Sequence, residues 1–234
     1  MEHLHNGFTL ELSSGAFPLS TDSIALAHFA AESRFDRYLD LGSGCGTLGL
    51  MLCAEKADCT VTGIELDMDA HSMALYNASA NGISSRLTSI CADMNNIRDF
   101  IPAGSYPCCI SNPPYFSAGP ASKTAVNARR QDCCTTDQLF AAAAWAVKYG
   151  GDFYLVHRPE CLAELFIAAG NYGFEPKRLR LLRHKQNGPV CLVLVQCRKG
   201  GKPGLKWDEF SLYDSTGTQT AYYRTLYHCQ EVTL

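Results

Sequence analysis

Short apolar segments alternate with amphipathic segments through most of this 234-residue chain. Seven apolar segments predict strands, and they lie at 37–42, 59–66, 87–93, 107–112, 152–157, 177–184 and 190–198. Helical patterns lie between them or ahead of them, at 20–34, 46–57, 67–82, 135–151 and 159–173. Strands that alternate with helices form parallel sheets covered on both faces. We therefore expect an α/β, doubly wound fold with a mostly parallel seven-stranded sheet, helices on both faces and an antiparallel last strand.

The composition suits one domain of this kind. Hydrophobic residues make up 47% of the chain, which is enough for one sizeable core. We expect a single domain over 1–234, with an N-terminal extension (1–19), a core (20–200) and a C-terminal extension (201–234). No run of eighteen apolar residues occurs and the first residues are polar, so we expect neither a membrane span nor an export signal, and a cytoplasmic location. None of the twelve cysteines forms a C-x-x-C pair, so we expect reduced thiols and no structural metal in a monomeric protein.

A glycine-rich loop follows the first predicted strand, in the sequence DLGSGCG. Gly42, Gly44 and Gly46 let the backbone turn tightly and approach a ligand closely. A dinucleotide-binding loop would need glycine where Thr47 stands. The acid that precedes the loop, Asp40, is unfavourable beside a phosphate and favourable beside an ammonium group. The loop therefore indicates a ligand that carries a positive charge.

The next two predicted strands also end in acidic residues. Glu65 can accept hydrogen bonds from two ribose hydroxyls, and Asp93 can accept one from an adenine amino group. Leu66 and Met94 would flank the adenine ring with apolar surface. Since the carboxyl ends of parallel strands share one edge of the sheet, these groups should meet around one ligand. A nucleoside with an ammonium group describes S-adenosyl-L-methionine, which becomes S-adenosyl-L-homocysteine on methyl transfer.

The fourth predicted strand ends in Asn112, Pro113, Pro114 and Tyr115. The two prolines stiffen the turn and remove competing donors. The Asn112 side-chain oxygen and the Pro113 carbonyl can then accept the N–H bonds of a planar exocyclic amine, and Tyr115 can stack on its ring. This arrangement orients a weakly nucleophilic nitrogen for attack on a methyl group. We predict catalytic roles for these four residues, with Asn112 also beside the cofactor.

These strand ends resemble those of class I S-adenosylmethionine-dependent methyltransferases, from about Thr21 to Arg198. The N-P-P-Y element is similar to that of amino-group methyltransferases, which act on adenine N6, cytosine N4 or a glutamine amide. The segments FPLSTDSIALAHFA, SNPPYF, NARRQ, GGDFYLVHRPECLAELF and RLRLLRH resemble the tRNA1(Val) (adenine-37-N6)-methyltransferase family. That resemblance implies methylation of adenine N6 at position 37 of valine tRNA. It also implies that Thr21 and Asp22 close the methionine end of the cofactor site.

Other functions remain open at this point. A glutamine-N5 protein methyltransferase or a guanine-N2 rRNA methyltransferase would use similar chemistry. A non-catalytic S-adenosylmethionine-binding, RNA-associated protein would keep the cofactor pocket without needing Asn112 to Tyr115. The run Ala128-Arg129-Arg130-Gln131 departs from the Ala-Arg-His-Glu run of the family.

Basic residues gather in one part of a chain whose net charge is −3. Between Pro176 and Trp207 there are nine Lys or Arg residues and no Asp or Glu. Such a run is either a solvated face or a surface for phosphates. If the substrate is tRNA, we expect its backbone and target base to contact Tyr115, Phe116, Arg129, Arg130, Lys177, Arg178, Arg180, Arg183 and Lys185.

Overall fold

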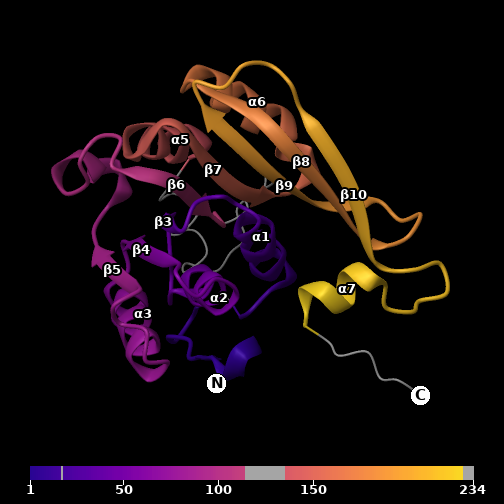
Figure 1. The fold of residues 1–234 in the computed structure, drawn as a ribbon, viewed down its shortest axis with the longest axis horizontal. Helices are drawn as coiled ribbons and strands as arrows, with labels where there is room; N and C mark the ends of the chain where they lie inside the picture. Colours follow the sequence, from indigo (N-terminus) through magenta and orange to yellow (C-terminus); the bar gives the residue numbers. More distant parts are fainter. Residues whose placement is uncertain (17, 114–134, 229–234) are drawn as a thin grey trace.

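The computed structural model of the protein describes residues 1–16, 18–113 and 135–228. Within them, eight strands form one sheet in the order β10-β8-β9-β7-β6-β3-β4-β5 (Figure 1). The strands span Arg37–Leu41 (β3), Thr60–Glu65 (β4), Leu87–Cys91 (β5), Tyr106–Ser111 (β6), Val147–His157 (β7), Phe174–Lys185 (β8), Val190–Lys199 (β9) and Lys206–Tyr213 (β10). All neighbours are parallel except β9, which is antiparallel to β7 and β8. The predicted doubly wound α/β fold is confirmed.

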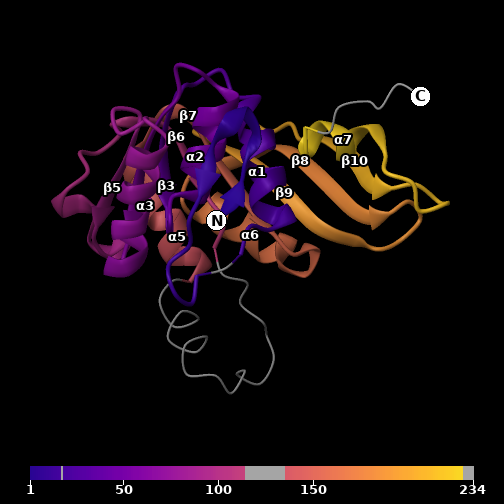
Figure 2. The same cartoon turned by 90° about the horizontal axis from the view of Figure 1, so that it is seen from below.

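Helices cover both faces of this sheet (Figures 1 and 2). One face carries α1 (Thr21–Ala31), α2 (Thr47–Glu55) and α3 (Met68–Ala80), and the other carries α5 (Thr136–Ala146) and α6 (Leu162–Asn171). Short 3-10 helices lie at His5–Gly7, Met94–Asp99 and Pro159–Cys161. Among the described helices, none combines the length and apolarity needed to cross a bilayer.

Side chains of the central strands alternate between two apolar cores. Tyr38 of β3 and Ile110 of β6 pack in the core under α1 and α2, whereas Leu39 and Cys109 pack in the core under α5 and α6. This alternation follows from the two-residue period of a strand. Asp40 has the same parity as Tyr38, so its side chain belongs to the row on the α1 side.

The strand count was predicted as seven and is eight. The additional strand, β10, pairs in parallel with β8 at the edge of the sheet, so the antiparallel β9 lies inside the sheet and not at its edge. Two acids within β10, Asp208 and Glu209, weaken its strand signal in the sequence. Its inward residues are Phe210 and Leu212, and the pattern is too short to identify a strand without its neighbour.

The helix predicted over 135–151 ends earlier, at Ala146. The chain turns directly into β7, and Val147 pairs with Tyr106 of β6. A side chain at Gly151 would put its Cβ 2.6 Å from the Pro107 carbonyl oxygen, so β7 and β6 approach closely there. Tertiary pairing therefore overrides the helical pattern of the last residues.

The N-terminal residues are bound along α3 by two asparagines. The short strands β1 (Glu2–His3) and β2 (Thr9–Leu10) form a hairpin. The side-chain amide of Asn77 accepts from the Glu11 N–H at 2.9 Å and donates to the Glu11 carbonyl at 2.8 Å. Asn81 makes the same pair of bonds with the backbone of Thr9, both at 2.8 Å. Each asparagine amide thus makes the pair of backbone hydrogen bonds that a neighbouring strand would make.

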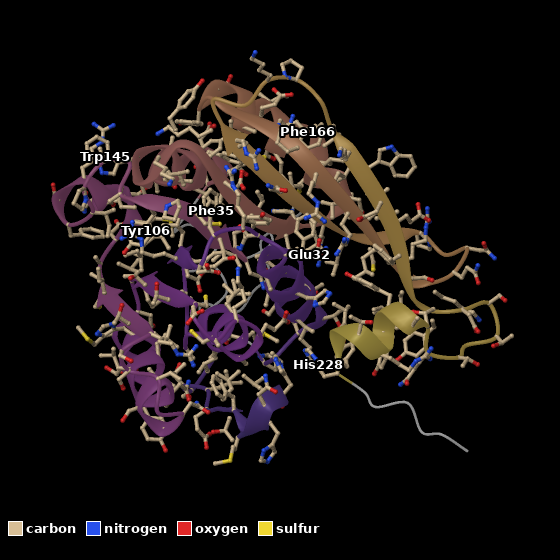
Figure 3. The ribbon with its side chains drawn as sticks, viewed as in Figure 1. Glu32, Phe35, Tyr106, Trp145, Phe166 and His228 are labelled. Atoms are coloured by element: carbon tan, nitrogen blue, oxygen red, sulfur yellow. The ribbon has the colours of Figure 1, made fainter. Side chains whose placement is uncertain are left out.

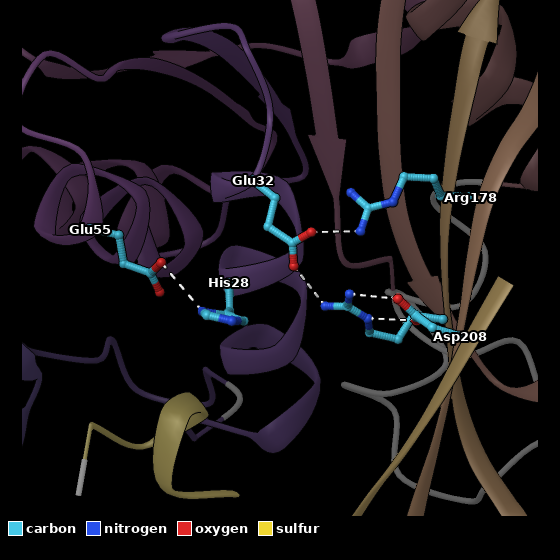
Figure 4. A network of polar contacts seen from close by, with 6 residues as sticks. His28, Glu32, Glu55, Arg178 and Asp208 are labelled. Carbon is cyan, nitrogen blue, oxygen red and sulfur yellow. Dashed lines mark hydrogen bonds and ion pairs between the residues drawn. The ribbon is translucent and has the colours of Figure 1, made fainter. Parts of the chain in front are cut away.

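Glu32 directly follows α1 (Figure 3), and a buried arginine joins it to the added edge of the sheet through the ion pairs drawn in Figure 4. Arg180 of β8 donates to both carboxylate oxygens of Asp208 at 2.8 Å and to Glu32 at 2.8 Å, although its side chain is only 6% exposed. Its guanidinium lies 5.0 Å from the ring centre of Phe29 and 4.8 Å from that of Phe210. Two carboxylates and these rings, with Tyr222 at 5.8 Å as a third, therefore compensate the burial of one charge.

We expect Arg180→Ala to lower the free energy of unfolding by about 3 kcal/mol, because it removes the buried cation between Glu32 and Asp208 and leaves Asp208 without its ion pair. Arg178→Ala is the matched control. Arg178 bonds to the same Glu32 at 2.6 Å but is 30% exposed, so its loss should cost about 1 kcal/mol or less. Urea denaturation of the two variants measures the difference. Equal losses would show that Arg180 is not the central contact.

Candidate active site

The strand order reverses between β3 and β6, and ligands of open α/β sheets bind at such a point. From β3 the chain proceeds outward to β4 and β5, and it then returns to β6 on the other side. Asp40 pairs with Ile110 of β6 and with Gly63 of β4. The Ser111 hydroxyl donates to the Leu41 carbonyl at 2.7 Å and ties the ends of β3 and β6 together. The predicted site residues that follow these strands therefore lie at one edge of the sheet, where folds of this kind form their binding crevice.

The glycine-rich loop turns as its sequence predicts. Gly42, Gly44 and Gly46 have φ between 55° and 82°, a region that disfavours other residues. The N–H groups of Gly42 and Ser43 both donate to the Ile64 carbonyl at 3.0 Å. These bonds fold the loop back over the end of β4. The loop then enters α2 at Thr47, so its backbone lines the crevice.

Asp40 is fully buried near the end of β3, just before the glycine loop, and neither carboxylate oxygen has a hydrogen-bond partner among the described residues. Burial, together with the nearby Glu65 carboxylate, raises the pKa of Asp40 to about 8. An unpaired buried acid destabilises the free protein. A cationic ligand group would supply the missing partner, so Asp40 fits the ammonium group predicted for this position.

Glu65 is held by the backbone around it. One carboxylate oxygen accepts from the Gly44 N–H at 2.7 Å, and the other accepts from the Asp67 N–H at 2.8 Å. These two bonds fix the carboxylate between the glycine loop and the start of α3. Each oxygen keeps a further lone pair for a ribose hydroxyl. The side chain of Leu66 beside it is 54% exposed and available to a ring.

Asp93 has a local role that the sequence analysis did not assign. Its Oδ1 accepts from the backbone N–H of Asn95 at 2.8 Å and from the Asn95 side chain at 2.9 Å, and it caps the 3-10 helix that begins at Met94. Oδ2 is the oxygen that would accept from an adenine amino group. The end of the Met94 side chain approaches Gly42, since a Cβ at Gly42 would lie 3.7 Å from it. Contact of both residues with adenine stays a prediction.

Asn112 lies directly after β6 and points toward α1. Its side-chain nitrogen donates to the hydroxyl of Ser23 at 3.0 Å. Pro113 follows and is buried. The other predicted residues of this region lie outside the described residues, namely Pro114, Tyr115, Phe116, Arg129 and Arg130.

The N-terminus of α1 also borders this region. Thr21 is the first residue of α1, and its hydroxyl lies 2.8 Å from the hydroxyl of Tyr227, close after α7 (Ala221–Leu226). Burial raises the pKa of Asp22. Both residues stand one turn or less from Ser23. This position is compatible with the role predicted for them at the methionine end of the cofactor, which stays a proposal.

The predicted basic surface is largely neutralised by acids from other elements. Arg180 is buried against Glu32 and Asp208, so its predicted contact with RNA is replaced by a structural ion pair. Arg183 bonds to Glu209 at 2.7 Å, and Arg178 bonds to Glu32. Glu32 is far from residues 176–207 in the sequence, and Asp208 and Glu209 directly follow them. The segment itself therefore contains no acid that indicates these ion pairs.

Two lysines of the predicted surface differ in position. Lys177 lies near the start of β8 and donates to the Lys202 carbonyl at 2.8 Å. Lys185 lies at the carboxyl end of β8 and is exposed. Because β8 runs in the same direction as β6 and β3, Lys185 lies at the sheet edge that carries the crevice.

Two residues of this region were missed by the sequence analysis. Ser23 lies in the segment FPLSTDSIALAHFA, where the sequence analysis assigned roles only to Thr21 and Asp22, and Tyr227 lies outside every motif. Only the packing of α1 and α7 shows the partners of these two hydroxyls. Among residues 1–16, 18–113 and 135–228, no three His, Cys, Asp or Glu side chains are grouped so that they could bind a metal ion.

We expect S-adenosyl-L-homocysteine to bind more tightly as the pH rises from about 6 to about 8, by up to about tenfold per pH unit. The reason is that the raised pKa keeps Asp40 protonated in the free protein, and a cationic partner requires it to lose that proton. Calorimetric titration in buffers of different ionisation enthalpy should detect release of about one proton at neutral pH.

Asp40→Asn should bind weakly and without this pH dependence. The stability of the variant is the control. In the wild type, the folded chain keeps a proton that the unfolded chain loses, so the free energy of unfolding falls as the pH rises from about 4 to about 8. Asp40→Asn should therefore be at least as stable as the wild type at pH 8. Tight, pH-independent binding by the variant would contradict the assignment of Asp40.

Several known proteins that resemble this chain in sequence or in fold carry the names of methyltransferases. A sequence profile of the methyltransferase small domain matches residues 20–168. The chain is 30% identical over 182 residues to the tRNA1(Val) (adenine(37)-N6)-methyltransferase of Photobacterium profundum, covering 76% of each chain. It is 33% identical over 179 residues to the enzyme of the same name from Cronobacter sakazakii, covering 72% of each.

Solved structures share the fold at low sequence identity. A protein of Agrobacterium tumefaciens described as a predicted O-methyltransferase superposes with a TM-score of 0.73 at 20% identity, over 89% of this chain and 96% of that one. Geranyl diphosphate C-methyltransferase from Streptomyces coelicolor, solved with S-adenosyl-L-homocysteine, gives 0.56 at 14% identity over 75% and 77%. From the profile match and the sequence relatives, we conclude that the chain belongs to the methyltransferase small-domain family.

Proposed function

We propose that this protein transfers a methyl group from S-adenosyl-L-methionine to N6 of adenine 37 in valine tRNA. As a member of its family the protein is a methyltransferase that uses this cofactor. The observation that carries the proposal is the position of Asn112, two residues after Ile110, which pairs with Asp40. The group that would orient an acceptor amine thus lies beside the group that would hold the cofactor's ammonium.

The residues of the crevice fit the cofactor. Asp40 offers an unpaired buried carboxylate, the glycine loop offers open backbone, and Glu65 offers a fixed pair of acceptor oxygens. When bound, the cofactor supplies an electrophilic methyl group on a sulfonium. We infer that the three groups hold its methionine and ribose ends so that the methyl group faces the end of β6.

Asn112 and Pro113 supply the orientation that the acceptor needs. An exocyclic amine conjugated with a ring is a weak nucleophile, and two acceptors on its N–H bonds align its lone pair. The Asn112 Oδ1 and the Pro113 carbonyl are such acceptors. The Asn112 side-chain nitrogen is already bonded to Ser23, which leaves the oxygen for the amine. No strong base is required, because the amine loses its proton as the new bond forms.

The choice of adenine in tRNA rests on the relatives. Those described above carry tRNA1(Val) adenine 37 in their names. A glutamine amide or a guanine amine could be oriented by the same two acceptors, and a binding protein without activity would not need them. A tRNA substrate implies a cytoplasmic protein, and we propose that it acts as a monomer.

Asn112→Ala should reduce methyl transfer by about two to three decades, equivalent to about 3–4 kcal/mol, because the lost contact matters most in the transition state. The fold and much of the affinity for S-adenosyl-L-homocysteine should be preserved. Single-turnover methylation of valine tRNA at saturating cofactor measures the rate, and mass spectrometry should identify N6-methyladenosine.

The control is Asn95→Ala, an asparagine that follows β5 at the far edge of the sheet and whose side chain bonds only to Asp93 in the described contacts. It should keep near-normal turnover. Wild-type turnover by Asn112→Ala would refute the mechanism. Methylglutamine or methylguanine as product would retain the mechanism and exclude the substrate.

Lys185→Glu should weaken tRNA binding and reduce the salt dependence of the affinity, because it reverses a charge at the edge that carries the crevice. The matched control is Lys206→Glu. Lys206 is also exposed, but it begins β10 and therefore lies at the opposite edge of the sheet. Filter binding at several salt concentrations compares the two. If both variants bind tRNA like the wild type, the RNA follows another surface.

A further inference from the structure

The side chain of Asn112 can present either of two groups to an acceptor. A primary amide has an oxygen that accepts and a nitrogen that donates, and the two have nearly the same shape. An incoming amine needs the oxygen, because its own N–H bonds must be accepted. The nitrogen would face those N–H bonds with further hydrogens. The activity therefore depends on which way the amide is held.

The contact that holds it comes from α1. The Asn112 nitrogen donates to the Ser23 hydroxyl at 3.0 Å, and Ser23 is 9% exposed. Ser23 is the third residue of α1, and its own N–H faces the hydroxyl of Ser20, the cap of the helix. The hydroxyl of Ser23 thus projects from a fixed first turn.

Contacts at both ends fix α1 itself. At the N-terminal end, the Thr21 hydroxyl bonds to that of Tyr227. Just past the C-terminal end, Glu32 binds Arg178 and Arg180 of β8 (Figure 4). A helix fixed at both ends can hold a side chain of the sheet in one orientation through a hydrogen bond.

We propose that Ser23 is a positioning residue for methyl transfer, which accepts the Asn112 nitrogen so that the Asn112 oxygen faces the acceptor amine. The proposal rests on the function proposed above. Ser23 acts through Asn112 and contacts neither substrate. A hydroxyl can also donate to the amide oxygen. The acceptor amine decides between the two arrangements, since it takes the oxygen, and Ser23 then satisfies the nitrogen that would otherwise be left without a partner.

Ser23→Ala should lower the single-turnover rate by about tenfold, because an amide nitrogen turned into a buried region would lose its acceptor. The KM for tRNA and the affinity for S-adenosyl-L-homocysteine should stay unchanged, since Ser23 touches neither. Ser23→Thr keeps a hydroxyl and should recover most of the rate. Ser33→Ala is the control: Ser33 is equally buried at 9% exposed and follows α1, but its hydroxyl bonds to the backbone of Phe35.

A measurement without substrate separates this proposal from the proposed function. In wild-type protein labelled on asparagine nitrogen, the Asn112 side-chain amide is the signal pair that disappears in Asn112→Ala. We expect this pair to shift and to exchange its hydrogens faster in Ser23→Ala, and to be unchanged in Ser33→Ala.

The combined outcomes decide each claim. An unchanged Asn112 signal in Ser23→Ala, or a changed signal with a wild-type rate, would overturn the role of Ser23. A tenfold loss that Ser23→Thr does not recover would also overturn it. If wild-type protein methylates no tRNA adenine, the proposed function fails, and the amide signal alone decides whether Ser23 holds Asn112.

Discussion

The parallel pairing of β3 with β6 is the constraint on which the site depends. These strands are far apart in the sequence, and the chain leaves them toward opposite edges of the sheet. Their register places Asp40 next to Ile110, and the Ser111 hydroxyl ties their ends together. A buried acid and an oriented amide therefore lie near each other at the same edge of the sheet. A slip of one residue would turn Asn112 away from α1, because successive side chains of a strand face opposite sides.

The C-terminal elements contribute to this crevice without lining its base. The edge strand β10 is linked to the end of α1 through Asp208, Arg180 and Glu32. Tyr227, just after α7, bonds to Thr21 at the start of α1, and α1 in turn holds Asn112 through Ser23. The C-terminal elements, which lie at the periphery in Figure 1, are thus connected to the acceptor side of the site through α1. In the role proposed for Ser23, these contacts explain how a serine in the first turn of α1 would affect methyl transfer.

The protein keeps one destabilising feature where it needs a ligand. Arg180 shows how this chain compensates a buried charge elsewhere, with two carboxylates and three aromatic rings around it. Asp40 is equally buried and has no such partners in the described structure. The contrast is physically informative, because an unpaired acid in a well-paired protein marks a position completed from outside.

The sequence by itself determined the fold class, the strands from β3 to β9 and the residues that end them, because strand and helix periods, glycines and prolines act locally. It also indicated the family through the residues around Asp40 and Asn112. Only the tertiary structure decided that β10 joins the sheet, that α5 stops at Ala146, and that the arginines of the basic segment are paired with Glu32, Asp208 and Glu209. It also decided that Ser23 meets Asn112. These outcomes depend on contacts between distant segments, and the local sequence does not specify which partner will lie within hydrogen-bond distance.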